Sequence, residues 1–118
     1  MNSNYTSNIV DLEDNNLSIK FEKLIKEFND KIDLIKESGG KVSVQKQHDK
    51  GRLTARERIA YLIDENTYFL ELAKFAGYNM YHEYGGCPCG GLIMGIGIIN
   101  DYNFMIIAND ATVKAGAY

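Results

Sequence analysis

Residues 90–118 have the sequence GGLIMGIGIINDYNFMIIANDATVKAGAY, and the two apolar runs within it decide the fold. The runs cover residues 92–99 and 104–108. Each has the length of a strand, and the polar residues 100–103 between them predict a β-hairpin. Both runs are continuously apolar instead of alternating, which is typical of strands covered on both faces. The rest of the chain offers few elements to cover them, so we expect further sequence to complete the sheet.

Two glycines, Gly95 and Gly97, form a GxG pattern inside the first apolar run. A dinucleotide-binding fingerprint would need a third glycine at position 100 and a helix beginning there. That position is Asn100, and a predicted strand surrounds the glycines. We therefore expect the pair to allow close packing within a sheet.

A short strand and a loop are predicted before the hairpin. Residues 69–75 alternate loosely between apolar and other side chains, which indicates a strand. Residues 77–91 contain Pro88 and several glycines, so they predict a loop.

The sequence Thr54-Ala55-Arg56-Glu57 is a capping box, which marks the start of a helix. We expect Ile59, Leu62 and Ile63 to form its buried side and residues 64–66 to end it. Before the box, residues 42–50 are polar and predict a connector without regular structure.

A long amphipathic helix is predicted from Leu17 to the stop at Gly39 and Gly40. Its apolar residues recur at gaps of three and four along one face. That face either binds a partner or packs on its own domain. Residues 1–16, rich in Asn and Ser, are expected to form a flexible tail, and residues 17–118 one incomplete domain. The apolar positions of the helix are Phe21, Leu24, Ile25, Phe28, Ile32 and Ile35.

The composition limits the class of function. A net charge of −3 and a pI near 5.3 argue against a nucleic-acid partner. No apolar run approaches the roughly 20 residues that span a bilayer, and the first residues do not resemble a secretory signal. We therefore expect no membrane association and a cytoplasmic location.

The two cysteines, Cys87 and Cys89, are separated by one residue. A disulfide at this spacing is strained, and a zinc site needs about four ligands. We expect two small thiols and no metal site.

Basic residues gather around the capping box. A helix N-terminus favours anions through its free N–H groups and its dipole, and basic side chains beside it can hold a phosphate. The alternative is a solvated face on which Arg56 or Arg58 pairs with an acid such as Glu57 or Asp49. The cluster comprises Lys50, Arg52, Arg56 and Arg58.

The segment after the second apolar run, residues 108–118, consists mostly of small residues with Lys114 among them. Ligands often bind where strands end in such a segment. An ordinary connection to a following helix is the alternative.

Three segments of the chain form a recognisable set. They are QKQHDKGRLTARERIAYLID (45–64), FLELAKFAGYNMY (69–81) and GGLIMGIGIINDYNFMIIANDATVKAGAY (90–118). Together they resemble the β (carboxyltransferase) subunits of biotin-dependent acyl-CoA carboxylases. The resemblance extends from Gln45 to the end and is strongest to methylcrotonyl-CoA carboxylase. It implies an α/β, partial crotonase-like (ClpP/crotonase) domain with a long amino-terminal helix, a second helix and a hairpin of buried strands.

The resemblance also implies site residues. Arg52, Ala55 and Arg56 match the family's KGRLTARERI segment near the CoA nucleotide, and Lys114 matches the lysine of its ATVK segment. These four are the candidate CoA contacts. The resemblance assigns no catalytic residue here, because the family's glycine-rich oxyanion holes lie beyond Tyr118. We therefore expect this chain alone to be inactive.

The implied reaction moves CO2 from carboxybiotin to an acyl-CoA, with 3-methylcrotonyl-CoA as the expected substrate. The implied partners are other β subunits and an α subunit that carries biotin and uses ATP as a biotin carboxylase. A non-catalytic CoA-binding module, or a subunit for propionyl-CoA or another acyl-CoA, is the alternative. The sequence departs from the family at Cys87 and Cys89, near a usual glycine run, and at Ala115, where glycine is frequent.

Overall fold

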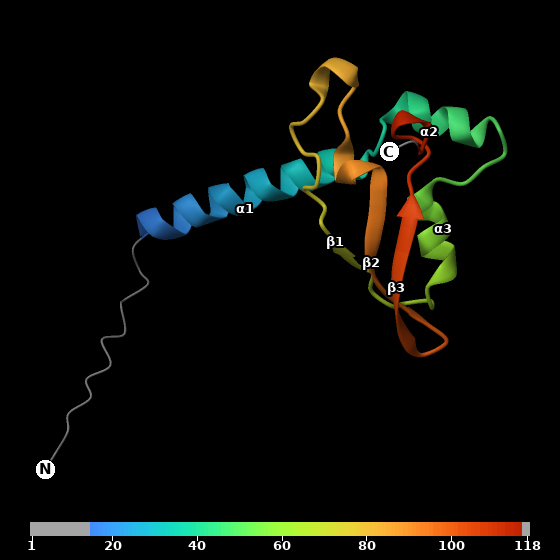
Figure 1. Ribbon diagram of the computed structural model, residues 1–118. Coiled ribbons are helices and arrows are strands. Elements are labelled where there is room, and N and C mark those ends of the chain that lie inside the picture. Colours follow the sequence, from blue (N-terminus) through green and yellow to red (C-terminus); the bar gives the residue numbers. More distant parts are fainter. Residues whose placement is uncertain (1–14, 117–118) are drawn as a thin grey trace, which may run out of the picture. The chain divides into compact units, whose positions relative to one another are not determined.

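The computed structural model of the protein describes residues 15–116, which belong to two compact units (Figure 1). The first unit ends at Lys31, and its described part is the beginning of helix α1 (Asn15–Lys36). The second unit starts at Ile32 and holds all the other elements. Helix α1 begins two residues before Leu17, its predicted first residue, and the predicted tail at residues 1–14 lies outside the described part.

Helix α1 has the apolar spacing that the sequence predicts, but its residues differ in burial. In the first unit Leu24 and Ile25 are exposed, whereas Ile35 in the second unit is 3% exposed. The helix ends at Lys36, before the predicted stop at Gly39 and Gly40, and the left-handed residue that follows it is Ser38, with a φ of 55°. Gly40, with a φ of 83° and a ψ of 164°, is instead the N-cap of the next helix. Whether the exposed face binds a partner or packs on its own domain stays a prediction.

Residues 42–50 were predicted as a connector, and this prediction was wrong. Helix α2 (Lys41–His48) occupies most of the segment. It buries no residue, so it lacks the apolar periodicity by which a helix is recognised in sequence. Polar contacts hold it instead. The Gln45 side chain donates to Asp49 at 2.8 Å, and His48 Nε2 lies 2.9 Å from the Glu57 carboxylate.

Helix α3 (Ala55–Leu62) starts at the predicted capping box. The backbone N–H of Glu57 donates to Thr54 Oγ1 at 3.3 Å, and the Thr54 N–H donates to the Glu57 carboxylate at 2.7 Å. The bond from the Thr54 N–H, together with that from His48, lowers the pKa of Glu57 to about 2. The helix buries Ala55 and Ile59, whereas Leu62 is exposed, contrary to the prediction.

Three antiparallel strands form a sheet in the order β1 (Leu70–Leu72), β2 (Leu92–Ile99) and β3 (Tyr102–Asn109). The hairpin is confirmed, but its turn has two residues instead of the predicted four. Asn100 and Asp101 have φ of 49° and 67°. Two-residue hairpin turns whose twist matches that of the strands need such positive φ values. The N–H groups of both residues donate to the Asp64 carboxylate at 2.9 Å. Asp64 therefore anchors the turn instead of ending α3.

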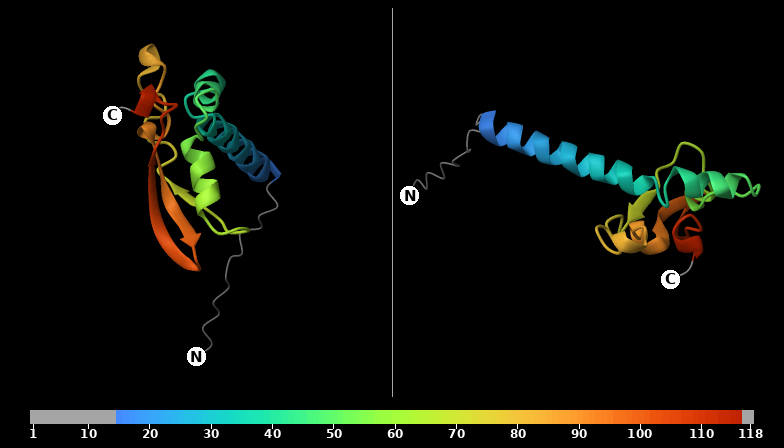
Figure 2. Two further views of the ribbon diagram at one scale, coloured as in Figure 1. Left: turned by 90° about the vertical axis from the view of Figure 1, so that its right-hand side faces the viewer. Right: turned by 90° about the horizontal axis from the view of Figure 1, so that it is seen from above.

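Helix α3 covers one face of the sheet (Figure 2). Ala55 and Ile59 of the helix form the core with Ile93 and Ile106 of the strands. The other face carries apolar side chains that no residue among 15–116 covers. The sequence predicts that both faces are covered, and the described part of the chain covers one of them. These side chains are Leu70, Leu72, Ile96, Met105 and Ile107.

Close packing explains the two glycines of β2. A Cβ at Gly95 would meet the carbonyl oxygen of Leu70, and a Cβ at Gly97 would lie 2.7 Å from Ile63. Real Cβ atoms do not approach neighbours so closely, so the predicted structural role of this GxG pattern is confirmed. The predicted loop 77–91 contains two 3-10 turns, at His82–Tyr84 and Pro88–Gly91.

Candidate functional site

The candidate site is a pocket of about 420 Å³ at the N-terminus of α3, called here the α3 pocket. It lies where the end of α2, the loop before α3 and the segment after β3 meet, and Figure 1 shows these segments at one end of the second unit. The lining residues are Gln47, Arg52, Leu53, Thr54, Ala55, Arg58, Ala111 and Thr112.

The α3 pocket is basic. Arg52 and Arg58 are both exposed and contribute two guanidinium groups, and no acid lines the pocket. One nitrogen of Arg58 donates to the carbonyl of Asn109 at 3.4 Å. This bond holds the Arg58 side chain at the end of β3, where the segment after the strand begins. Ala55 is the first residue of α3 and is 2% exposed. A helix start with two arginines beside it has the chemistry of a phosphate site.

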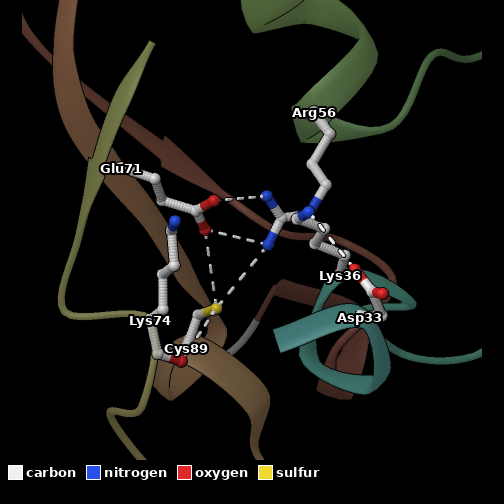
Figure 3. Close-up of polar contacts among 6 residues, drawn as sticks. All are labelled: Asp33, Lys36, Arg56, Glu71, Lys74 and Cys89. Atoms are coloured by element: carbon white, nitrogen blue, oxygen red, sulfur yellow. Dashed lines mark hydrogen bonds and ion pairs between the residues drawn. The ribbon is translucent and has the colours of Figure 1, made fainter. Parts of the chain in front are cut away.

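Arg56 lies outside the α3 pocket, in a partly buried ion pair (Figure 3). Its two terminal nitrogens donate to the two carboxylate oxygens of Glu71 in β1, at 2.8 and 2.9 Å. Burial opposes the charge of the guanidinium, but the bond to Glu71 and its negative charge outweigh this and raise the pKa of Arg56. Arg56 thus pairs with an acid, which was the alternative to a phosphate contact in the sequence analysis. The acid is Glu71 and neither Glu57 nor Asp49.

Lys114 also lies outside the lining of the α3 pocket. Its amine is 4.8 Å from the centre of the Tyr81 ring and 5.7 Å from that of Tyr84, within the range of cation–π attraction. Lys114 and Ala115 both have positive φ, at 45° and 55°. The structure therefore brings Arg52 and Ala55 together in one pocket and places Arg56 and Lys114 elsewhere.

A buried pair of polar residues, Asp110 and Thr112, fixes one part of the α3 pocket, because Thr112 lines that pocket. Asp110 and Thr112 are 3% and 6% exposed. The Asp110 carboxylate accepts from the N–H and the hydroxyl of Thr112, at 3.0 and 2.6 Å. Thr112 Oγ1 in turn accepts from the N–H of Gly39 at 3.0 Å. The spacing of Asp110 and Thr112 is that of a side-chain turn, and this is the local signal by which the pair could have been found.

The two cysteines differ in their surroundings. Burial raises the pKa of the Cys89 thiol to about 11, although the charge of Arg56 acts against this. The Cys89 sulfur lies 3.7 Å from Arg56 and 3.8 Å from Glu71, as Figure 3 shows. Cys87 is half-buried. Within residues 15–116 no three side chains of metal-binding type gather, and no helix is long and apolar enough to cross a membrane.

We expect iodoacetamide to alkylate Cys87 well before Cys89 at pH 7.5. The thiolate is the reactive form, and Cys89 is both buried and almost wholly protonated at this pH. Peptide mass spectrometry after timed quenching measures the two rates. The variant Cys87→Ser should lose the fast phase and keep the slow one. Equal rates at both cysteines would contradict the buried position of Cys89.

Comparison with known proteins gives the family. The carboxyl transferase domain matches residues 46–118. The mitochondrial methylcrotonoyl-CoA carboxylase β chain of Arabidopsis thaliana is 40% identical over 86% of this chain. The mitochondrial β chain of Dictyostelium discoideum is 41% identical over 85% of it. This chain spans 17% of the length of each relative.

The fold is also found among solved structures. A crystal structure of transcarboxylase 12S, with methylmalonyl-coenzyme A and methylmalonic acid bound, matches 81% of this chain with a TM-score of 0.72 and 28% identity. The match covers 19% of that chain. It confirms the predicted α/β, crotonase-like carboxyltransferase fold. Because the domain match covers more than half of the chain and the two relatives are at least 40% identical, the chain belongs to the carboxyltransferase family of biotin-dependent acyl-CoA carboxylases.

Proposed function

We propose that this chain provides part of the acyl-CoA site of a carboxyltransferase that moves CO2 from carboxybiotin to 3-methylcrotonyl-CoA. Residues 17–118 are then the amino-terminal part of the acyl-CoA-binding domain. The observation that carries this proposal is the basic α3 pocket, which combines a helix N-terminus with Arg52 and Arg58. The names of the two β-chain relatives, both methylcrotonoyl-CoA carboxylases, support 3-methylcrotonyl as the acyl group of the substrate.

The proposed role of the α3 pocket is to hold a CoA phosphate. In the first turn of α3 the N–H of Glu57 already donates to Thr54 Oγ1, so the N–H groups of Ala55 and Arg56 are the ones that point their positive ends toward an anion at this helix start. The Ala55 side chain packs in the core, so this residue can contact the phosphate only through its backbone N–H. Arg52 is exposed and can close over the phosphate with charge-assisted hydrogen bonds.

Arg56 and Lys114 complete the proposed set of CoA contacts. A phosphate near Arg56 has to share the guanidinium with Glu71, because both terminal nitrogens already bond to that carboxylate. The Lys114 amine lies on the Tyr81 ring and remains exposed. Arg52 and Ala55 are therefore the contacts that the geometry supports best.

The proposal includes the partners that the family implies. Carboxybiotin comes from an α subunit that carries biotin and uses ATP, and further β subunits complete an oligomer. The hexamer assembly of transcarboxylase 12S supports an oligomer of this kind. The predicted cytoplasmic location stays a prediction.

The test is calorimetric titration of the 118-residue chain with CoA. We expect Arg52→Ala to weaken CoA binding by roughly tenfold or more, because a hydrogen bond to a charged group contributes about 1.5–3 kcal/mol. Lys50→Ala is the matched control, since Lys50 is exposed nearby but does not line the α3 pocket. Pantetheine, which lacks the nucleotide phosphates, should bind equally to the chain and to its Arg52→Ala variant. Absence of CoA binding, or equal losses in both variants, would refute the assignment of this pocket.

A further inference from the structure

Helix α2 contributes one wall of the α3 pocket. Gln47, near the end of this helix, lines the pocket, and its carbonyl accepts from the backbone N–H of Arg52 at 3.0 Å. The position of α2 therefore sets the position of Arg52, the proposed phosphate contact. Because α2 buries no residue, its place on the domain depends on polar contacts near its two ends.

One of these contacts lies directly before the start of α2. The N–H of Gly39 donates to Thr112 Oγ1 at 3.0 Å, and the next residue, Gly40, is the N-cap of the helix. The two segments lie close together, since a Cβ at Gly39 would meet the carbonyl oxygen of Thr112. Near the other end of α2, the Gln47 side chain donates to the carbonyl of Ala111 at 3.5 Å. The segment after β3 thus holds α2 at both ends.

Asp110 fixes the direction of the bond between Thr112 and Gly39. Its carboxylate accepts from the Thr112 hydroxyl at 2.6 Å and from the Thr112 N–H at 3.0 Å. Because the hydroxyl proton points to Asp110, an oxygen lone pair is left to accept from the N–H of Gly39. Asp110 and Thr112 are both buried, so water competes little for these bonds.

We propose that Thr112 is a positioning residue of the α3 pocket. Its hydroxyl holds the start of α2, and through α2 the backbone of Arg52, in the arrangement that receives a phosphate. Thr112 lines the pocket, but its hydroxyl already donates and accepts within the protein, so it acts through α2 instead of binding the ligand itself. This inference rests on the proposed function of the α3 pocket and adds to it a residue that is far from Arg52 in the sequence.

Two consequences separate positioning from a purely structural role. Without the link from Thr112 to Gly39, α2 leaves its place for part of the time. The apparent affinity for a phosphate then falls in proportion to the fraction of molecules in which α2 is in place. Such coupling is reciprocal, so a bound phosphate must also hold α2 more firmly. A residue that only adds to global stability changes neither property of the folded protein.

The experiment compares the 118-residue chain with its Thr112→Val and Thr112→Ser variants, and the probe is CoA. Thr112→Val removes the hydroxyl and should weaken CoA binding roughly tenfold in calorimetric titration. In hydrogen exchange followed by NMR, its α2 amides should exchange about tenfold faster, with the α3 amides unchanged. Thr112→Ser keeps the hydroxyl and should bind CoA within about twofold of the unaltered chain. Saturating CoA should slow exchange in α2 of the unaltered chain.

Two further variants test how Thr112 acts. Thr67→Val is the matched control, because it removes a hydroxyl that donates to the Asp64 carbonyl at 2.6 Å outside the α3 pocket, and it should leave CoA binding unchanged. Gly39→Ala disturbs the link from the side of α2, since the new Cβ would meet the Thr112 carbonyl. The losses of affinity in Gly39→Ala and Thr112→Val should not add in the double variant, because both variants break the same contact.

The outcomes distinguish this inference from the proposed function. Unchanged CoA binding in Thr112→Val, or exchange that rises as much in α3 as in α2, overturns the positioning role and leaves the α3 pocket in place. Absence of CoA binding by the unaltered chain refutes the α3 pocket and the positioning role with it. The effect of CoA on α2 exchange needs no variant, so its absence overturns the positioning role even if Thr112→Val does not fold.

Discussion

Replacing Glu71 with alanine is expected to lower the free energy of unfolding by about 1.5–3 kcal/mol, because it leaves the partly buried Arg56 charge without its hydrogen-bonded partner. The Glu71 and Arg56 side chains are 7% and 25% exposed, and two hydrogen bonds of 2.8 and 2.9 Å join them. The pair also connects α3 to β1, so its loss affects the packing of both elements. Urea unfolding at pH 7, followed by circular dichroism, measures the change.

Two further variants identify the cause of that loss. Glu65→Ala removes an exposed carboxylate and should change stability by less than about 0.5 kcal/mol. The double variant Arg56→Met/Glu71→Leu replaces both charges with apolar groups and should recover most of the stability, since buried ion pairs are often no better than apolar packing. If Glu71→Ala behaves like Glu65→Ala, the ion pair is screened by solvent and contributes little.

The parts of this fold that the sequence predicts are local ones. The hairpin follows from two apolar runs with a polar turn, and the start of α3 follows from Thr54 and Glu57, which are three residues apart. The turn was predicted too long, because Tyr102 and Asn103 are polar enough to look like turn residues. Their pairing with Ile99 and Ile98 becomes visible only when the register of the two strands is known.

The parts that the sequence does not predict depend on contacts between distant residues. Arg56 and Glu71 are 15 residues apart, and Gly39 and Thr112 are 73 apart. One signal was available for Glu71. It lies between Leu70 and Leu72 in a strand, so its side chain points to the opposite face from theirs, which is the face that α3 covers. A carboxylate on a covered face needs a basic partner.

The two expected departures from the family, Cys89 and Ala115, stand where the backbone favours glycine. Both residues have a positive φ, at 53° and 55°, in the region that favours glycine. The side chain of Cys89 contacts Arg56 and Glu71. The structure shows no comparable contact for Ala115 among the residues it describes. Composition alone does not reveal that the backbone at these two positions favours glycine.

Replacing Gly95 with alanine is expected to cost about 1–3 kcal/mol of folding stability or more, as overfilling of a packed interior typically does. The new Cβ would meet the carbonyl oxygen of Leu70 and would lie 2.6 and 2.8 Å from two atoms of the Phe69 ring. The carbonyl belongs to β1, which is only three residues long and pairs with β2 at this point. Relief of the overlap therefore requires β1 to move away from β2.

The control for Gly95→Ala is Gly51→Ala, which separates overlap from backbone strain. Gly51 has a φ of 67°, and a Cβ there has no neighbour within 4 Å, so its substitution costs only the roughly 1–2 kcal/mol of a left-handed alanine. Both variants lose stability, but only Gly95→Ala should shift the amide NMR signals of β1 and weaken the Arg56–Glu71 pair. The double variant Gly95→Ala/Glu71→Ala should then lose less stability than the two single variants lose together, because Gly95→Ala already disturbs the Arg56–Glu71 pair. Unchanged β1 signals together with fully additive losses would show that β2 accommodates the methyl group without moving β1, and that close packing against β1 does not require glycine at position 95.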